Sequence, residues 1–245
     1  MSEPFAISRR FRGPENSGNG GYTCGLVAGY VSGDAEVTLR RPPPLERPLE
    51  VTRDGDRVLL HDGPDLVAEA VPTRLELEVP PPPTADEAEA AARTYAGFRH
   101  HFFPGCFVCG PERPAGDGLR LFPGWVPGRD LVAAPVHAAA SLPAAGGFLG
   151  REIAWSLLDC PGAWAMERDM EATGVVLGRM AARVLHPIPV LSSGVAMGWP
   201  LGREGRKLYS GTAFFGADGR LYGYARQTWI VMAPSPLSTP PAPTG

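Results

Sequence analysis

The chain has 245 residues, which is enough for one large domain or two small ones. Hydrophobic residues make up 44% of it and charged residues 20%, as is usual for globular proteins, and its apolar runs are too short to span a bilayer. The net charge of -3 gives no electrostatic reason to expect binding to nucleic acid.

The N-terminal segment and the cysteines bear on the cellular compartment. Residues 1–12 include basic side chains, but no apolar stretch follows them, so we predict no signal peptide. The four cysteines occupy mixed contexts that do not suggest a disulfide framework. We therefore expect a reduced, cytoplasmic protein that does not associate with membranes.

The first part of the chain predicts one helix followed by several strands. A glycine-rich helix is expected over about residues 20–31, directly after Asn19. Alternating and β-branched runs then predict strands, at 35–41, 49–53, 57–61 and 66–79. The sequence Asp-Gly-Pro-Asp at 62–65 is a hairpin signal between the last two strands. We interpret residues 1–80 as one unit.

A linker follows this unit. The prolines at 80–83 form a stiff, extended break, and the Ala- and Glu-rich stretch 85–98 predicts a connecting helix. We assign residues 81–104 to the linker and 105–233 to a second unit. Residues 234–245 are proline-rich without periodicity, which predicts a disordered tail.

The second unit repeats the order of elements in the first. Two short strands are expected near 119–122 and 131–136, and then a helix over 150–167. The strands that follow are predicted at 175–184, 194–199, 207–215 and 221–232. The last two are joined by a turn at 216–219 that corresponds to the turn at 62–65. This order indicates a diverged internal duplication.

One buried helix followed by an antiparallel sheet is an α+β unit. The ordered set of motifs resembles a double hotdog protein of the acyl-CoA thioesterase superfamily. Residues 106–110 (CFVCG) with 118–121 (GLRL) resemble the opening strand of small acyl-CoA thioesterases, and 155–161 resemble the helix that carries their catalytic acid. The resemblance implies two tandem units, each a curved antiparallel sheet around a central helix, and no cofactor besides a coenzyme A thioester as substrate.

The resemblance also implies one catalytic site made from both units. In the family, an Asn-Gly-Gly or His-Gly-Gly helix entry polarises the thioester carbonyl, and an acid follows nine residues after its first residue. Asn19, Gly20 and Gly21 match the entry, but Ala28 stands at the acid position of the first unit. The second unit has lost the entry and keeps the acid as Asp159.

The two halves complement each other if the central helices pack side by side in opposite senses. Asp159 then faces the amides of Gly20 and Gly21 across one substrate's width, about 4–8 Å. It acts as a general base for water or as a nucleophile that forms a mixed anhydride, and the sequence does not choose between these roles.

Tyr22 and Trp155 are the predicted substrate-binding residues, beside Trp164 and Phe148. Core packing explains these aromatic side chains equally well.

Each element of the predicted site also has a structural explanation. Asn19-Gly20-Gly21 suits an ordinary capped helix entry, and Asp159 suits a helix-end carboxylate bonded to local backbone. Gly21, Gly25 and Gly29 recur every fourth residue, which favours close packing of another helix.

A metal site is weighed and set aside. Cys106 and Cys109 follow His100 and His101, but zinc requires four suitably placed ligands. Cys24 and Cys160 fall in predicted helices, where they are poorly placed to complete such a site. A tight turn with buried thiols explains the cysteine pair, and we expect no metal.

The leading functional hypothesis is hydrolysis of an acyl thioester carried by coenzyme A or by an acyl-carrier protein. The alternatives are a hotdog dehydratase or hydratase, which the absence of a histidine from both central helices disfavours, and a protein that binds an acyl ligand or a partner without turnover. The expected partners are the acyl thioester or carrier protein, with a homodimer of double hotdogs as an allowed assembly, and neither nucleic acid nor membrane.

Overall fold

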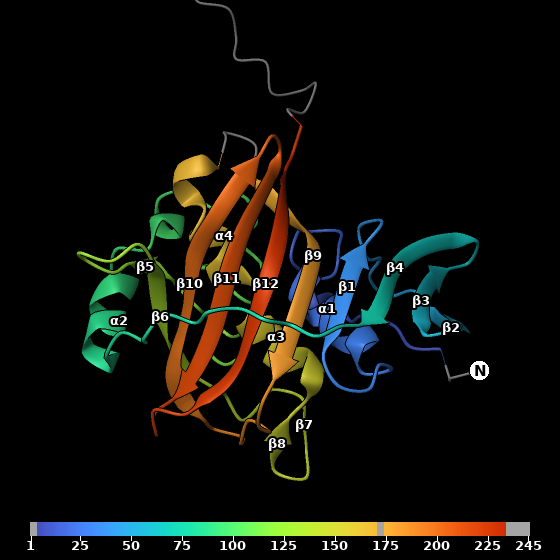
Figure 1. The fold of residues 1–245 in the computed structure, drawn as a ribbon, viewed down its shortest axis with the longest axis horizontal. Coiled ribbons are helices and arrows are strands. Elements are labelled where there is room, and N and C mark those ends of the chain that lie inside the picture. The colour runs from blue at the N-terminus through green and yellow to red at the C-terminus, as the bar shows by residue number, and fades with distance from the viewer. Residues whose placement is uncertain (1–3, 171–173, 234–245) are drawn as a thin grey trace, which may run out of the picture.

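The computed structural model describes residues 4–170 and 174–233. In this part of the chain, ten strands form one antiparallel sheet in the order β2-β3-β4-β1-β9-β12-β11-β10-β6-β5 (Figure 1). The first four strands are β1 (Ala35–Leu39), β2 (Glu50–Asp54), β3 (Arg57–Asp62) and β4 (Asp65–Pro72). The others are β5 (Gly124–Trp125), β6 (Val132–His137), β9 (Val175–Val184), β10 (Ser193–Glu204), β11 (Lys207–Gly216) and β12 (Leu221–Val231).

Eight of the sheet's ten strands form two copies of one topology, and β6 and β5 extend the second copy. In the first copy the spatial order is β2-β3-β4-β1, and in the second it is β10-β11-β12-β9, so that the first strand of each copy pairs with the last. The copies meet where β1 pairs with β9, with Val37 opposite Met180. This arrangement confirms the predicted α+β fold with two tandem hotdog units, and a duplication explains why the two copies share one topology.

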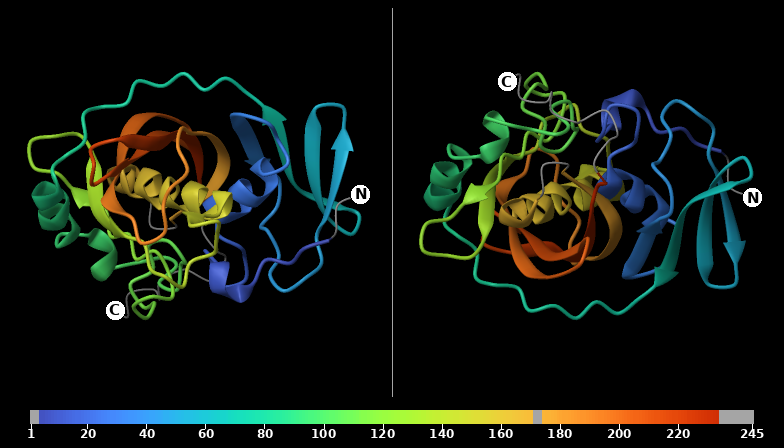
Figure 2. Two further views of the ribbon diagram at one scale, coloured as in Figure 1. Left: turned by 90° about the horizontal axis from the view of Figure 1, so that it is seen from below. Right: turned by 90° about the horizontal axis from the view of Figure 1, so that it is seen from above.

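Three helices lie within the curve of the sheet. They are α1 (Gly20–Ala28), α3 (Arg151–Leu157) and α4 (Cys160–Trp164). Figure 2 shows α3 and α4 enclosed by the strands of the second unit, with α1 beside them. Helices α1 and α3 run in opposite senses, because a Cβ atom added at Gly21 would meet Asp159 and one added at Gly25 would lie 2.5 Å from Cα of Glu152. The predicted antiparallel pairing of the central helices is confirmed.

Several of the predicted elements differ from the structure. The strand expected over 66–79 ends at Pro72, and the helix expected over 85–98 ends at Ala92. The helix expected over 150–167 is broken into α3 and α4, because Asp159 has non-helical dihedral angles (φ -84°, ψ -83°). The strand expected near 119–122 is absent. The backbone N–H groups of Leu119 and Leu121 donate instead to the carbonyl oxygens of Phe107 and Val108, at 2.9 and 2.8 Å.

The linker contains two short helical segments. These are α2 (Ala85–Ala92), which a capping box between Thr84 and Glu87 begins, and the 3₁₀ turn η2 (Ala96–Phe98). Residues 73–84 have no helix or strand and cross the outer face of the second unit's strands (Figures 1 and 2). The predicted tail, 234–245, lies outside the described residues.

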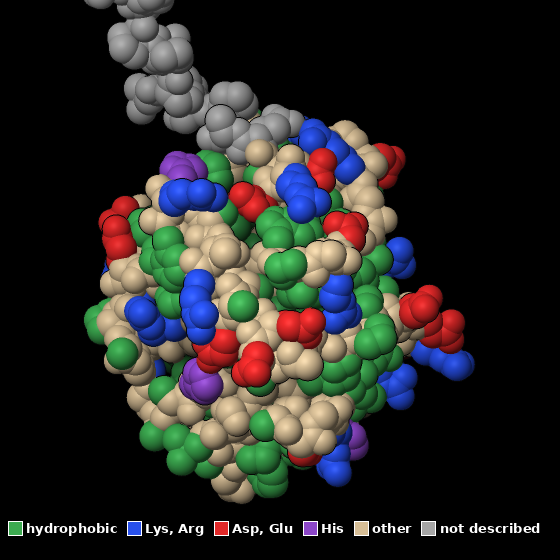
Figure 3. Space-filling view, turned by 90° about the vertical axis from the view of Figure 1, so that its left-hand side faces the viewer, with side chains coloured by type: hydrophobic (Ala, Val, Ile, Leu, Met, Phe, Trp, Pro, Cys, Tyr) green, Lys and Arg blue, Asp and Glu red, His purple; other side chains and the backbone are tan. Residues whose placement is uncertain are grey.

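The remaining elements are short. They are the 3₁₀ turns η1 (Arg9–Phe11) and η3 (Glu167–Asp169) and the two-stranded hairpin of β7 (Ala144–Ala145) and β8 (Phe148–Leu149). The face in Figure 3 mixes basic, acidic and apolar side chains, and no sign of charge dominates it. Every helix in 4–170 and 174–233 is too short or too polar to cross a lipid bilayer.

Candidate active site

The main chain around Asp159 is held by polar side chains from the sheet. The break between α3 and α4 leaves the carbonyl oxygen of Leu158 without a helical partner, while that of Asp159 accepts from the N–H of Gly162 at 3.1 Å. Nε2 of Gln227, on β12, donates to both of them, at 2.6 and 3.0 Å. The hydroxyl of Thr212, on β11, also donates to the Leu158 carbonyl, at 2.7 Å. The sheet therefore fixes the backbone that carries the predicted catalytic acid.

A second layer of buried polar groups holds Gln227 in place. Its Oε1 accepts hydrogen bonds from the hydroxyl of Ser210 at 3.0 Å and from Nε1 of Trp229 at 3.1 Å. Gly162 faces this amide so closely that a Cβ atom there would collide with Oε1. These polar residues were not predicted from the sequence. They could have been noticed there, because they stand at inward-facing positions of strands whose other inward-facing residues are mostly apolar.

Asp159 itself is buried, with 1% of its surface exposed. Its Oδ2 accepts a hydrogen bond from Nδ2 of Asn19 at 2.8 Å, whereas Oδ1 has no hydrogen-bond partner among the described residues. Burial raises the pKa of Asp159 to about 7, and the negative charge of the Cys106 sulfur adds to that effect. The Asn19 amide, the Gly21 backbone and the Cys160 thiol oppose the rise in pKa. This environment favours a carboxyl group that exchanges a proton near neutral pH.

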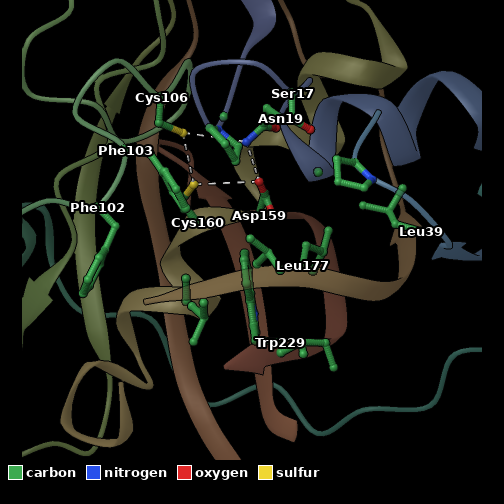
Figure 4. A pocket seen from close by; sticks show the side chains of 18 of the residues that line it. Ser17, Asn19, Leu39, Phe102, Phe103, Cys106, Asp159, Cys160, Leu177 and Trp229 are labelled. Atoms are coloured by element: carbon green, nitrogen blue, oxygen red, sulfur yellow. Dashed lines mark hydrogen bonds between the residues drawn. The ribbon is translucent and has the colours of Figure 1, made fainter. Parts of the chain in front are cut away.

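The side-chain amide of Asn19 links the two units, because its oxygen and its nitrogen bond to different units. As the N-cap of α1, its Oδ1 accepts a hydrogen bond from the backbone N–H of Tyr22 at 2.9 Å. That bond directs Nδ2 toward Asp159. The amide therefore caps the helix of one unit and orients the carboxylate of the other, and a dashed line in Figure 4 marks its bond to Asp159.

The glycine entry and the acid are closer than sequence analysis predicted. A Cβ atom added at Gly21 would lie 2.8 Å from the carboxyl carbon of Asp159, so no substrate fits between this glycine and the acid. Gly21 and Gly25 remove side chains from the helix–helix contact, which allows this approach. Gly20 differs from Gly21 because it lines a cavity and its backbone N–H has no acceptor among the described residues.

The cavity has a volume of about 490 Å³, within the range of small-molecule sites. Asn19 and Asp159 lie at one side of it, Gly20 also lines it, and most of the remaining wall is apolar (Figure 4). The first unit contributes Leu39 to that wall, the linker Phe102 and Phe103, and the second unit residues that include Trp164, Leu177 and Trp229.

The predicted aromatic substrate contacts are mostly core residues. Tyr22 is buried and stacks on Phe11 with ring centroids 4.1 Å apart. Trp155 is 2% exposed and packs beside Gly25. Neither residue lines the cavity, and Phe148, which is largely exposed, does not line it either. Trp164 does line it.

Three thiols gather beside the acid. The sulfurs of Cys106, Cys109 and Cys160 all lie within 4.8 Å of one another, and all three residues are buried. The Cys160 sulfur is 3.8 Å from that of Cys106 and 3.8 Å from Oδ2 of Asp159. The expectation that Cys160 stands apart from the Cys-x-x-Cys turn was wrong, because the α3–α4 break points the first residue of α4 toward that turn.

Solved structures with low sequence identity share this fold. A candidate thioesterase II from Thermobifida fusca YX is 11% identical with a TM-score of 0.59, and the match covers 94% of this chain and 92% of that one. The acyl-CoA thioesterase II TesB2 from Mycobacterium marinum is 13% identical with a TM-score of 0.55, covering 88% and 91%. A hot dog fold protein of unknown function from Alicyclobacillus acidocaldarius is 9% identical with a TM-score of 0.54, covering 95% and 93%. No family model and no curated protein matches the sequence.

Proposed function

We propose that this chain hydrolyses an acyl thioester of coenzyme A or of an acyl-carrier protein in the cavity between its two units. The observation that carries the proposal is the buried carboxyl group of Asp159, which the other unit's Asn19 orients beside an apolar cavity. An acyl chain suits the apolar wall, and the thioester then lies at the polar side. The thioesterase descriptions of two structural neighbours agree with this chemistry.

Asp159 is the proposed catalytic residue. Its Oδ1 has free lone pairs, so it can take a proton from a water molecule that attacks the thioester carbonyl. The carbonyl carbon gains a bond to that water oxygen, the carbon–sulfur bond breaks, and the departing thiolate takes up a proton. Direct attack by the carboxylate, followed by hydrolysis of the mixed anhydride, uses the same residue and no further cofactor.

Gly20 is the proposed donor to the carbonyl oxygen. Its N–H belongs to the first turn of α1, where backbone donors lack helical partners and the helix dipole is positive. Gly20 lines the cavity, whereas Gly21 packs against Asp159. Asn19 is a positioning residue in this scheme, because it holds the carboxylate and caps the same helix.

Binding of an acyl thioester without turnover is the competing proposal. Its supporting observation is the contact between Asp159 and Gly21, since the carboxyl group occupies space at the glycine entry where a thioester carbonyl was expected. Under this proposal the cavity still accepts the acyl chain, but no water reaches the carbonyl with the carboxylate as base.

Turnover assays distinguish these proposals. The purified protein is incubated with coenzyme A thioesters of short, long and aromatic acyl groups, and with an acyl-carrier-protein thioester, while released thiol is measured. We expect hydrolysis by the wild type, and a loss of about 10²-fold or more in Asp159→Asn with substrate binding retained. Equal turnover in a folded Asp159→Asn variant removes Asp159 from the mechanism. Saturable binding without thiol release by the wild type supports the binding protein instead.

A further inference from the structure

We infer that Cys106, Cys109 and Cys160 bind a thiophilic divalent cation of the zinc class. This site adjoins the proposed hydrolytic site, since the Cys160 sulfur is 3.8 Å from Oδ2 of Asp159, but the inference does not rest on hydrolysis. It also departs from the sequence-based expectation of no metal. That expectation excluded Cys160 because of its predicted helix, and the structure brings its sulfur to the other two.

The distances between the sulfurs suit a tetrahedral ion. Zinc–sulfur bonds of about 2.3 Å place two ligands of a tetrahedral ion about 3.8 Å apart. The Cys106 and Cys160 sulfurs are 3.8 Å apart, and all three sulfurs lie within 4.8 Å of one another. A disulfide requires sulfurs about 2.05 Å apart and would leave the third thiol unpaired. One ion accounts for all three thiols at once.

The turn that carries two of these thiols has the form of a metal-binding turn. The N–H of Gly110 donates to the carbonyl of Cys106 at 2.9 Å, closing the Cys-x-x-Cys segment on itself. A side chain at Gly110 would place a Cβ atom 2.5 Å from the Cys106 backbone nitrogen, so the tight turn requires glycine. The hydroxyl of buried Tyr95 donates to the Cys109 carbonyl at 3.1 Å. The two sulfurs are therefore held in position before any ion arrives.

His101 supports the site from outside the ligand set. The backbone N–H of Phe103 donates to Nδ1 of His101 at 2.9 Å, which leaves the proton of the neutral ring on Nε2. Nε2 lies 3.4 Å from the Cys109 sulfur, where its N–H can donate a hydrogen bond to a metal-bound thiolate. Second-shell donors of this kind stabilise metal-bound ligands.

The Cys106 sulfur also has a donor from outside the cluster. Nδ2 of Asn19 lies 3.8 Å from this sulfur and donates to it, which suits a metal-bound thiolate. Binding of the ion displaces the thiol protons to solvent and forms three metal–sulfur bonds without any redox change. Three protein ligands leave one tetrahedral position for water.

Cobalt(II) titration tests the site directly. Reduced, metal-stripped protein is titrated with Co²⁺ alone, and the thiolate-to-cobalt charge-transfer band is followed. Competition with Zn²⁺ then gives the relative affinity. We expect one Co²⁺ per chain, a charge-transfer intensity that corresponds to three thiolates, and full displacement by Zn²⁺. No band, or a stoichiometry well below one in the folded wild type, overturns the inference without recourse to any variant.

Single substitutions identify the ligands. Cys106→Ser, Cys109→Ser and Cys160→Ser are each expected to weaken Co²⁺ binding by more than about 100-fold, because loss of outer-shell partners already costs about 10–100-fold. His101→Phe is expected to cost about 10-fold. Cys24→Ser is the matched control, since Cys24 is equally buried but lies in α1 outside the cluster. Unchanged binding in all three cluster variants, or an equal loss in Cys24→Ser, contradicts the assignment.

Discussion

The two units share a topology but place different residues against their central helices. Helix α1 is continuous and faces inward side chains of β3 and β4 that are apolar, among them Val58, Leu60 and Ala70. The second unit's helix is broken, and β11 and β12 present Thr212 and Gln227 to the break. A helix break exposes carbonyl groups, so it needs a polar wall.

Under the proposed function, this difference explains how a duplicated chain has one composite site. The continuous helix keeps a glycine entry that allows close approach, and its acid position is Ala28. The broken helix keeps Asp159 and holds it with the sheet. Each unit therefore supplies a feature that the other unit lacks. The hydrogen bond between Asn19 and Asp159 joins the two features.

Gly21→Val is expected to have the largest effect. The added side chain would collide with Asp159 and force the two helices apart. Overpacking of this kind typically costs about 1–3 kcal/mol, and the displaced carboxyl group should abolish thiol release. Urea denaturation and the turnover assay measure the two effects. Gly29→Ala is the control from the same stripe, because a Cβ atom there meets only carbonyls of its own helix. Equal losses in both variants would contradict a specific role for the contact between Gly21 and Asp159.

Gln227→Met tests the comparison between the polar wall of the second unit and the apolar wall of the first. It removes one donor to the Leu158 and Asp159 carbonyls, which keep the Thr212 hydroxyl and the Gly162 N–H, and it leaves the buried Ser210 hydroxyl without its acceptor. An unsatisfied buried group costs about 1–3 kcal/mol, so we expect a loss of that size in unfolding free energy and a fall in kcat that exceeds any change in KM. As a comparison in the apolar wall of the other unit, Leu60→Met on β3 should cost less than about 1.5 kcal/mol and leave kcat unchanged. Similar results for the two variants would contradict the role of the polar wall.

Tyr22→Phe is expected to have the smallest effect. Tyr22 is packed in the core and does not line the cavity, and the structure gives its hydroxyl no hydrogen bond to any described residue. The unfolding free energy should therefore change by about 0.5 kcal/mol or less, with KM for every acyl chain length unchanged. A selective rise in KM for one acyl length would return Tyr22 to the substrate-binding residues.

Much of the architecture could be predicted from local sequence. The strands of both units follow the alternation of apolar residues, and the turns at 62–65 and 216–219 mark the hairpins, because both signals depend on neighbouring residues. The helix break at Asp159 could not be predicted in this way. It depends on Thr212 and Gln227, which lie more than fifty residues later and act only after the sheet has formed.

In the candidate site, too, some contacts could be predicted from the sequence and others depend on the folded structure. The proximity of Asn19, Gly21 and Asp159 could be predicted because a family resemblance supplied their relative positions. The approach of Cys160 to Cys106 could not, since it requires the helix break and the turn at 106–110 to meet in three dimensions. The same long-range dependence explains why Tyr22 and Trp155 were placed in the acyl pocket.

A double-mutant cycle between Asn19 and Asp159 tests the composite site most directly. Asn19→Ser retains a helix-capping side chain but is too short to reach the carboxyl group, so it separates capping from positioning. Asp159→Asn, Asn19→Ser and the double variant are compared by kcat/KM for thioester hydrolysis. We predict that Asn19→Ser lowers kcat/KM by about 10-fold in the wild-type background and has no further effect when Asp159 is already Asn. Independent, additive effects on kcat/KM would contradict one site built from both units.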